Sequence, residues 1–177
     1  MDEIFQHAAW QVEDALEVAS RIYFGRSSFP ERRLVEHVSN GTERDHLLVI
    51  HWAANWDEIE ELEEALIDAF TKQSKIKRVE NESDKSEGRH SGSWSTLYVS
   101  FALKADFPSI PGATVVERLN RRNRLWPSPA VPTSPTLLRC DLTPEEAKSE
   151  LNRLALEGNS RTPAHVQKHA LTYKKRK

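Results

Sequence analysis

The chain has 177 residues, 38% hydrophobic and 29% charged, which fits one small globular domain with an appendage. No stretch is apolar for long enough to cross a bilayer. A single cysteine, Cys140, excludes an internal disulfide framework and a cysteine-rich zinc site. The N-terminal run MDEIFQHAAW is acidic and lacks the basic and apolar regions of a secretory signal, so we expect a cytoplasmic protein with no membrane partner.

The charge is distributed unevenly along the chain. Residues 1–108 contain 12 Lys/Arg and 21 Asp/Glu, whereas residues 109–177 contain 13 and 6. A basic half joined to an acidic half indicates that affinity for nucleic acid is concentrated in the C-terminal region. A solvated basic tail is the alternative, and charge alone does not decide between the two.

The first elements expected along the chain are a helix, a strand and a second helix. Apolar residues recur at helical spacing over 3–20. The run 21–25 has β character and ends in glycine. A helix should follow from Ser28, which can act as its cap, with Pro30 in its first turn, and should reach about Val38.

Strand and helix signals alternate in the middle of the chain. The pattern predicts a strand over 46–52, a helix over 56–72, a polar loop over 80–93 and a strand over 94–103. Either Asn55 or Asp57 can cap the helix. The mixture of elements predicts an α/β (α+β) domain, whose boundaries we place at residues 1–106.

The rest of the chain divides into a proline-rich segment and a basic helical extension. Residues 107–141 should be a stiff linker with little regular structure, apart from a short basic helix over 115–124. The extension over 142–177 should begin with a helix capped by Thr143 and stopped by Gly158. A second, basic helix would follow, and it would either dock on DNA or serve as a packing extension with a lysine-rich tail.

One group of residues suggests a catalytic site. Arg33 lies ten residues after the tyrosine of the run Tyr23-Phe24-Gly25, and His37 lies four residues after Arg33. Positions four apart share one face of a helix, so Arg33 and His37 can point together toward the end of the Tyr23 strand. This arrangement resembles the second signature of the GIY-YIG endonucleases, in which a strand ending in Tyr-aliphatic-Gly precedes a helix that carries Arg and often His.

Two later positions extend the resemblance to about 85 residues. The segment Glu61–Ile67 is similar to the catalytic helix of the family, and that alignment selects Glu63, with Glu64 as the alternative. Asn81 stands where the family often has asparagine. The resemblance implies a small sheet of three to four strands flanked by helices.

The resemblance also implies a mechanism, namely hydrolysis of DNA phosphodiester bonds with one divalent metal ion, Mg²⁺ or Mn²⁺. Glu63 would hold that metal, which acts as a Lewis acid on the phosphate. Arg33 would grip a phosphate oxygen with its guanidinium fork. Tyr23 would act as or orient the general base, and His37 would share proton or phosphate contacts.

The first signature of the family, Gly-Ile-Tyr, has no counterpart where it is expected. That position lies about ten residues before Tyr23, within the predicted N-terminal helix. We expect the run Leu97-Tyr98-Val99 to occupy the vacant place in the sheet and to present Tyr98 as the second catalytic tyrosine.

The remaining candidates are nucleic-acid contacts, and two other functions stay open. The expected DNA-contacting residues are Arg26, Asn81, Arg89, Lys174, Lys175 and Arg176. The first alternative function is that of a catalytically inactive relative of the GIY-YIG endonucleases, which binds nucleic acid or a protein partner. It is suggested by the missing signature and by the acidic character of residues 1–108. The second alternative is a plain α/β interaction module. The sequence leaves the oligomeric state open.

Overall fold

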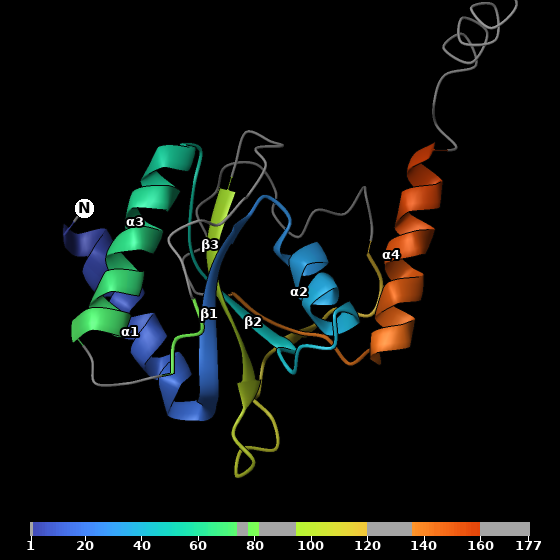
Figure 1. The fold of residues 1–177 in the computed structure, drawn as a ribbon, viewed down its shortest axis with the longest axis horizontal. Coiled ribbons are helices and arrows are strands. Elements are labelled where there is room, and N and C mark those ends of the chain that lie inside the picture. The colour runs from blue at the N-terminus through green and yellow to red at the C-terminus, as the bar shows by residue number, and fades with distance from the viewer. Residues whose placement is uncertain (1, 74–77, 82–94, 120–135, 160–177) are drawn as a thin grey trace, which may run out of the picture.

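The computed structural model describes residues 2–73, 78–81, 95–119 and 136–159. In chain order the elements are α1 (Asp2–Val18), β1 (Ala19–Ser27), α2 (Pro30–Ser39), β2 (His46–Ala53), α3 (Trp56–Asp68), a π-helical turn (Ala69–Gln73), β3 (Ser95–Leu103), β4 (Thr114–Val115), β5 (Thr136–Arg139) and α4 (Pro144–Asn159). Figure 1 shows them as a sheet with helices on both faces. None of the described helices has the length and apolar character needed to cross a membrane.

The five strands form one sheet in the order β1-β3-β2-β5-β4. β3 pairs with β1 on one side and with β2 on the other, antiparallel in both cases. β5 is antiparallel to β2, and β4 is parallel to β5. The register of the β1–β3 pair sets Ser100 opposite Tyr23 and Tyr98 opposite Gly25, so both tyrosines lie in one region of the sheet.

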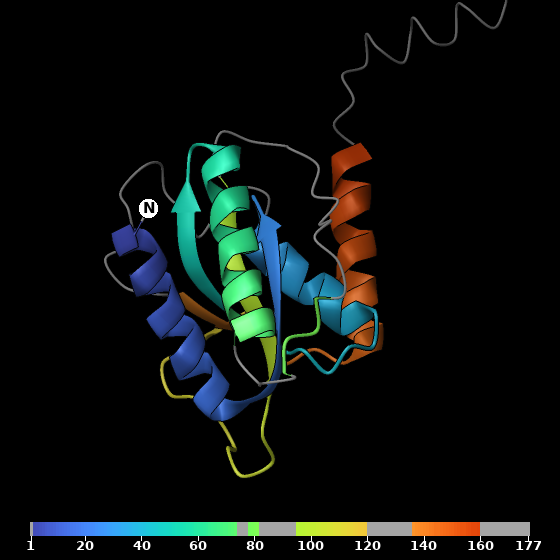
Figure 2. The same cartoon turned by 60° about the vertical axis from the view of Figure 1, so that its left-hand side comes forward.

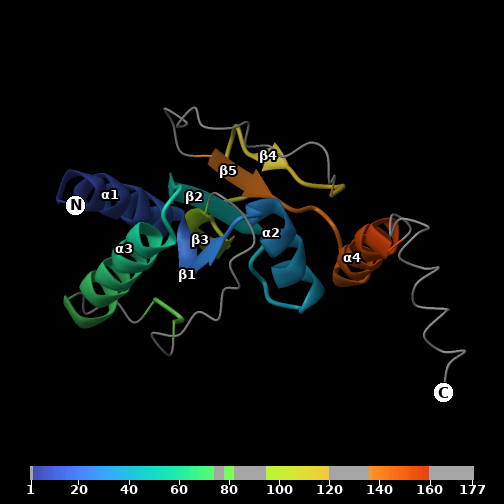
Figure 3. The ribbon, with the colours of Figure 1, turned by 90° about the horizontal axis from the view of Figure 1, so that it is seen from above.

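Helices cover both faces of the sheet and define two cores. α1 and α3 lie on one face, and α2 and α4 lie on the other (Figures 2 and 3). Side chains of a strand alternate between the faces, so Ile22 and Phe24 enter the α1/α3 core, whereas Tyr98 packs in the α2/α4 core. Tyr23 therefore faces α2, while Arg26, which is in phase with Phe24, faces α3.

The outer edge of β1 is covered by the short segment 78–81. Ile22 N–H donates to the carbonyl of Arg78 at 2.9 Å, and Glu80 N–H donates to the carbonyl of Ile22 at 3.0 Å. The Asn81 side chain continues this pairing, because its Oδ1 accepts from Phe24 N–H at 2.9 Å and its Nδ2 donates to the Phe24 carbonyl at 3.0 Å. An unpaired strand edge is a liability in water, and this segment satisfies its backbone groups.

The α/β class and the flanking helices are confirmed, but the described sheet has five strands where three to four were predicted. The extra strands come from the segment that was expected to be a linker with little regular structure. β5 is only four residues long and follows a run of prolines, so its strand signal was weak. Pairing with His46–Val49 and complete burial of Leu138 stabilise it nevertheless.

The predicted helix ends and one predicted helix differ from the structure at several positions. Ser28 does not cap α2: the cap position is Phe29, without a side-chain hydrogen bond, and Pro30 in the first turn needs no partner for a backbone donor. The capping box at Thr143 is present as predicted, but α4 continues past Gly158 to Asn159. Residues 115–119 of the predicted 115–124 helix are not helical, and 120–124 lie outside the described residues, as does the predicted second C-terminal helix.

Candidate functional site

Three rings from three different elements meet on the α2 face of the sheet. His37 projects from the last turn of α2, its ring centroid 5.8 Å from that of Tyr23 on β1 and 6.2 Å from that of Tyr98 on β3. The Tyr98 hydroxyl lies 3.4 Å from His37 Nε2. The strand that carries Tyr98 thus lies beside the Tyr23 strand, as expected.

Gly25 permits this arrangement because Tyr98 lies directly over it. A Cβ atom at position 25 would lie 2.4 Å from the Tyr98 hydroxyl oxygen and 2.5 Å from the ring carbon that bears it. Carbon and oxygen atoms do not approach so closely without bonding, so any side chain at position 25 would displace the ring. Position 25, the last residue of the Tyr-Phe-Gly run, therefore requires glycine for steric reasons.

Two arginines bring positive charge to the three rings. Arg33, on α2, is 43% exposed and donates from Nη1 to Glu36 at 2.8 Å. Burial alone would lower the pKa of Arg33, but the contact with Glu36 raises it overall. Arg44, in the turn before β2, places its guanidinium carbon 4.6 Å from the centre of the Tyr23 ring.

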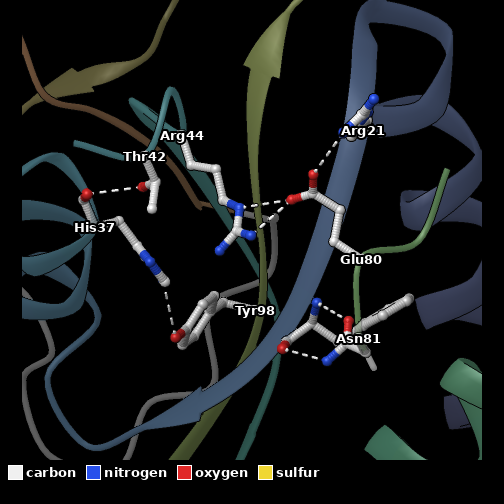
Figure 4. Close-up of polar contacts among 8 residues, drawn as sticks. Arg21, His37, Thr42, Arg44, Glu80, Asn81 and Tyr98 are labelled. Atoms are coloured by element: carbon white, nitrogen blue, oxygen red, sulfur yellow. Dashed lines mark hydrogen bonds and ion pairs between the residues drawn. The ribbon is translucent and has the colours of Figure 1, made fainter. Parts of the chain in front are cut away.

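Sequence reasoning did not identify Arg44. A basic residue between two acidic neighbours in a loop has no periodicity or spacing that would single it out. The turn itself is well anchored, since Thr42 donates from both its backbone nitrogen and its hydroxyl to the His37 carbonyl, and Gly41 adopts a φ of 71°. We call Tyr23, Arg33, His37, Arg44 and Tyr98 the tyrosine–arginine cluster, most of which appears in Figure 4.

The cluster holds His37 neutral and Tyr98 protonated at neutral pH. Burial, followed by the positive charges of Arg44 and Arg33, lowers the pKa of His37 from 6.5 to about 4. Burial raises the pKa of Tyr98 well above its ordinary value of 10.0. In the tautomer that carries its proton on Nδ1, a neutral imidazole has Nε2 available to accept a hydrogen bond from the Tyr98 hydroxyl.

Glu63 lies on the opposite face of the sheet from the tyrosine–arginine cluster. It belongs to the buried side of α3, and its Oε2 lies 2.7 Å from Arg26 Nε, with both side chains less than 5% exposed. Glu60 contacts the same guanidinium at 2.8 Å, and the guanidinium stacks on Trp56 at 4.7 Å. The prediction that Arg26 contacts DNA is therefore wrong, because its guanidinium is buried between two carboxylates and an indole.

The surroundings of Glu63 do not fit a magnesium site. Mg²⁺ requires near-octahedral oxygen ligands and usually retains several water molecules, so its carboxylate ligand must open onto solvent. Here an arginine holds the Glu63 carboxylate within the interior. Among residues 2–73, 78–81, 95–119 and 136–159, no three His, Cys, Asp or Glu side chains are grouped so that they could hold a metal ion.

The other predicted contact residues are not part of the cluster. The Oδ1 and Nδ2 atoms of Asn81 are both hydrogen-bonded to the backbone of Phe24, so this residue stabilises the edge of β1. Arg89, Lys174, Lys175 and Arg176 lie outside the described residues. The structure thus brings together Tyr23, Arg33, His37 and Tyr98, and their function stays a prediction.

Comparison of the chain with protein-family models, with curated proteins and with solved structures finds no match. The resemblance to the GIY-YIG endonucleases therefore depends on the quoted residues alone.

Replacing Gly25 by Ala should destabilise the fold by about 1–3 kcal/mol, the usual cost of overpacking a filled site. The cause is the 2.4 Å approach to Tyr98, so the cost should fall in a Tyr98→Leu background, where the colliding atoms are absent. Urea unfolding of the four proteins of this cycle measures the coupling. Equal costs in both backgrounds would contradict the steric role of Gly25.

Acidification should destabilise the protein through His37. Its pKa in the folded state is about 4 and its ordinary value 6.5, so the unfolded chain takes up the proton first as the pH falls. Stability is therefore complete above about pH 6.5 and is lost toward pH 4, by roughly 2 kcal/mol between pH 7.5 and pH 4.5. Urea unfolding at both pH values should show that His37→Gln loses less stability than the wild type; the same loss in both proteins would refute the assignment.

Proposed function

We propose that the chain binds the phosphate backbone of DNA through the tyrosine–arginine cluster. The observation that supports this proposal is the gathering of two guanidinium groups around one neutral imidazole and a tyrosine hydroxyl. Arg33 and Arg44 both lie close enough to His37 to lower its pKa, so their charges act on the same small volume. Two positive charges that act on the same small volume favour the binding of an anion there.

The residue types match the chemistry of a phosphodiester group. A guanidinium offers a planar fork of donors that fits two phosphate oxygens, and a phenol hydroxyl can donate a further hydrogen bond. Contacts of this kind supply most of the hydrogen bonds in protein–DNA interfaces and fix the orientation of the nucleic acid. The cluster thus supports phosphate binding without specifying a base sequence.

Exposure favours a long polyanion over a small phosphorylated ligand. Arg33 is 43% exposed, and its neighbour Arg32, which is held by the same Glu36, is 57% exposed. Small ligands are usually enclosed by the residues that bind them, whereas a DNA strand runs across a surface. The exposed pair on α2, which consists of Arg33 in the cluster and its neighbour Arg32, suits the second case.

Hydrolysis of the bound phosphodiester is a second candidate function. The observation in its favour is the neutral His37 in contact with the Tyr98 hydroxyl and beside Tyr23, since groups of this kind can accept and deliver protons. The position of Glu63 is unfavourable to the metal-dependent form of this function. Binding is therefore the primary proposal, and cleavage is a separate question for experiment.

Arg33→Gln should weaken binding of a DNA oligonucleotide about tenfold, because it removes hydrogen bonds to a charged acceptor. Its slope of log affinity against log salt concentration should fall by about one. Fluorescence anisotropy over a range of salt concentrations measures both quantities. Lys148→Gln removes the same charge from an exposed position on α4 and is the matched control. If the wild type shows no salt-dependent binding, or both variants weaken it equally, the proposal fails.

Plasmid DNA incubated with Mg²⁺ or Mn²⁺ tests the second candidate. We expect wild type and Glu63→Gln to give the same products, with or without a chelator, because Glu63 is paired with Arg26 rather than open to a metal. Loss of one partner from a buried ion pair is destabilising, so circular dichroism must show that the variant is folded. Nicking that disappears both with chelator and in folded Glu63→Gln would return Glu63 to the role of metal ligand.

A further inference from the structure

A bridge between Arg44 and Glu80 lies at the edge of the tyrosine–arginine cluster. Glu80 Oε2 accepts from Arg44 Nε at 2.9 Å and from Arg44 Nη2 at 2.6 Å. Figure 4 shows this carboxylate between Arg44 and Arg21, on the side of Arg44 away from His37. Side by side, Nε and Nη2 form one edge of the guanidinium, so the bridge fixes the orientation of the whole plane.

Glu80 is itself held on a rigid frame. Its backbone nitrogen donates to the Ile22 carbonyl, and its neighbour Asn81 is hydrogen-bonded twice to Phe24. These hydrogen bonds fix the position of the Glu80 carboxylate relative to β1, the strand that carries Tyr23. Because Arg44 is hydrogen-bonded to Glu80, its guanidinium is held relative to β1 and not only relative to the turn that contains Arg44.

Arg44 gains a defined place through these contacts. A free arginine side chain samples many rotamers, and fixing it costs up to about 2 kcal/mol of conformational free energy. Here the Arg44 side chain is 21% exposed, and its guanidinium carbon lies 4.6 Å from the centre of the Tyr23 ring. Its third nitrogen, Nη1, points toward Tyr98 and the His37 ring (Figure 4). The donors not used by Glu80 are thus directed at the cluster.

We infer that Glu80 is a positioning residue, which fixes Arg44 as the second phosphate-binding cation of the site, opposite Arg33. This inference rests on the proposed function for the phosphate itself, whereas the positioning of Arg44 is a property of the fold alone. The anion would lie between the two guanidinium groups and receive donors from both. Arg44 thereby becomes a phosphate contact that the resemblance did not assign.

Glu80 has two effects on a nearby phosphate, and they are opposite in sign. As a negative charge it repels the phosphate, so its removal on that ground alone would strengthen binding. As a positioning residue it holds Arg44 in place, so its removal would weaken binding. The sign of the change in affinity therefore separates positioning from charge.

DNA binding by four variants measures this sign. We expect Arg44→Gln and Glu80→Gln each to weaken binding about tenfold relative to wild type, with a salt slope lower by about one in both. Arg21→Gln is the matched control, because Arg21 contacts the same carboxylate at 3.4 Å but is 71% exposed and lies on the far side of it; it should change affinity less than threefold. The double variant Arg44→Gln/Glu80→Gln should bind no more weakly than Arg44→Gln alone. Tighter or unchanged binding by Glu80→Gln would overturn the inference.

The titration of His37 tests the positioning without any ligand. The charged and titratable groups around this ring are Arg33 and Glu36 on α2, Arg44 in the following turn, Tyr23 on β1 and Tyr98 on β3. Loss of a negative charge at position 80 would by itself lower the pKa of His37, whereas release of Arg44 would raise it. We expect imidazole chemical shifts from NMR to show a higher pKa for His37 in both Arg44→Gln and Glu80→Gln than in wild type.

The two measurements separate the two possible failures. If wild type does not bind DNA, the proposed function fails, and the direction of the His37 shift still decides whether Glu80 positions Arg44. If wild type binds DNA but Glu80→Gln leaves or lowers the pKa of His37, the binding function stands and the positioning role is overturned.

Discussion

The antiparallel pairing of β1 with β3 is the constraint on which the candidate site depends. It brings Gly25 opposite Tyr98, and the missing side chain of the glycine leaves room for the tyrosine ring. α2 packs on the same face and adds His37, whose ring contacts those of both tyrosines. Residues separated by more than sixty positions thus meet because of one strand pair. The segment 78–81 protects the other edge of β1 and contributes Glu80 to the same region.

The two faces of the sheet treat charge differently. On the α3 face Arg26 and Glu63 are buried and form an ion pair, and such a pair offsets its desolvation cost only when the geometry is good. On the α2 face Arg33 and Arg44 retain contact with solvent, and each has a glutamate partner, Glu36 or Glu80. The exposed Arg33 guanidinium can exchange its glutamate for a phosphate at little cost, and Arg44 keeps donors that Glu80 does not use, whereas the buried Arg26 guanidinium can do neither. This difference explains why the anion-binding proposal concerns the α2 face.

Sequence patterns predicted the parts of the site that depend on local geometry. The spacing of Arg33 and His37 on one helix follows from helical periodicity. The Tyr98 strand was expected beside the Tyr23 strand because the first family signature has no counterpart before Tyr23 and leaves a place in the sheet. Glu63 was expected beside Tyr23 because of the family alignment alone, although helical periodicity places it with Ile59 and Leu66 on the buried face of α3. Alternation along β1 does place Arg26 in phase with Phe24, and this signal could have shown that Arg26 faces the core. Arg44 and β5 depend on tertiary contacts, for which the local sequence has no pattern.

The alternation of side chains along β1 also limits how the chain can vary in length. Tyr23 and Arg26 point to opposite faces, and the ladder with β3 runs without interruption from Arg21 to Ser27. A deletion or insertion of one residue between them would turn one of the two toward the wrong helix layer, which would leave either a charge among apolar side chains or the cluster without its first tyrosine. Relatives of this protein should therefore differ in loop length, while the interval from the tyrosine to the buried arginine stays constant. That interval, with the intervening glycine, is a short pattern by which distant relatives can be recognised.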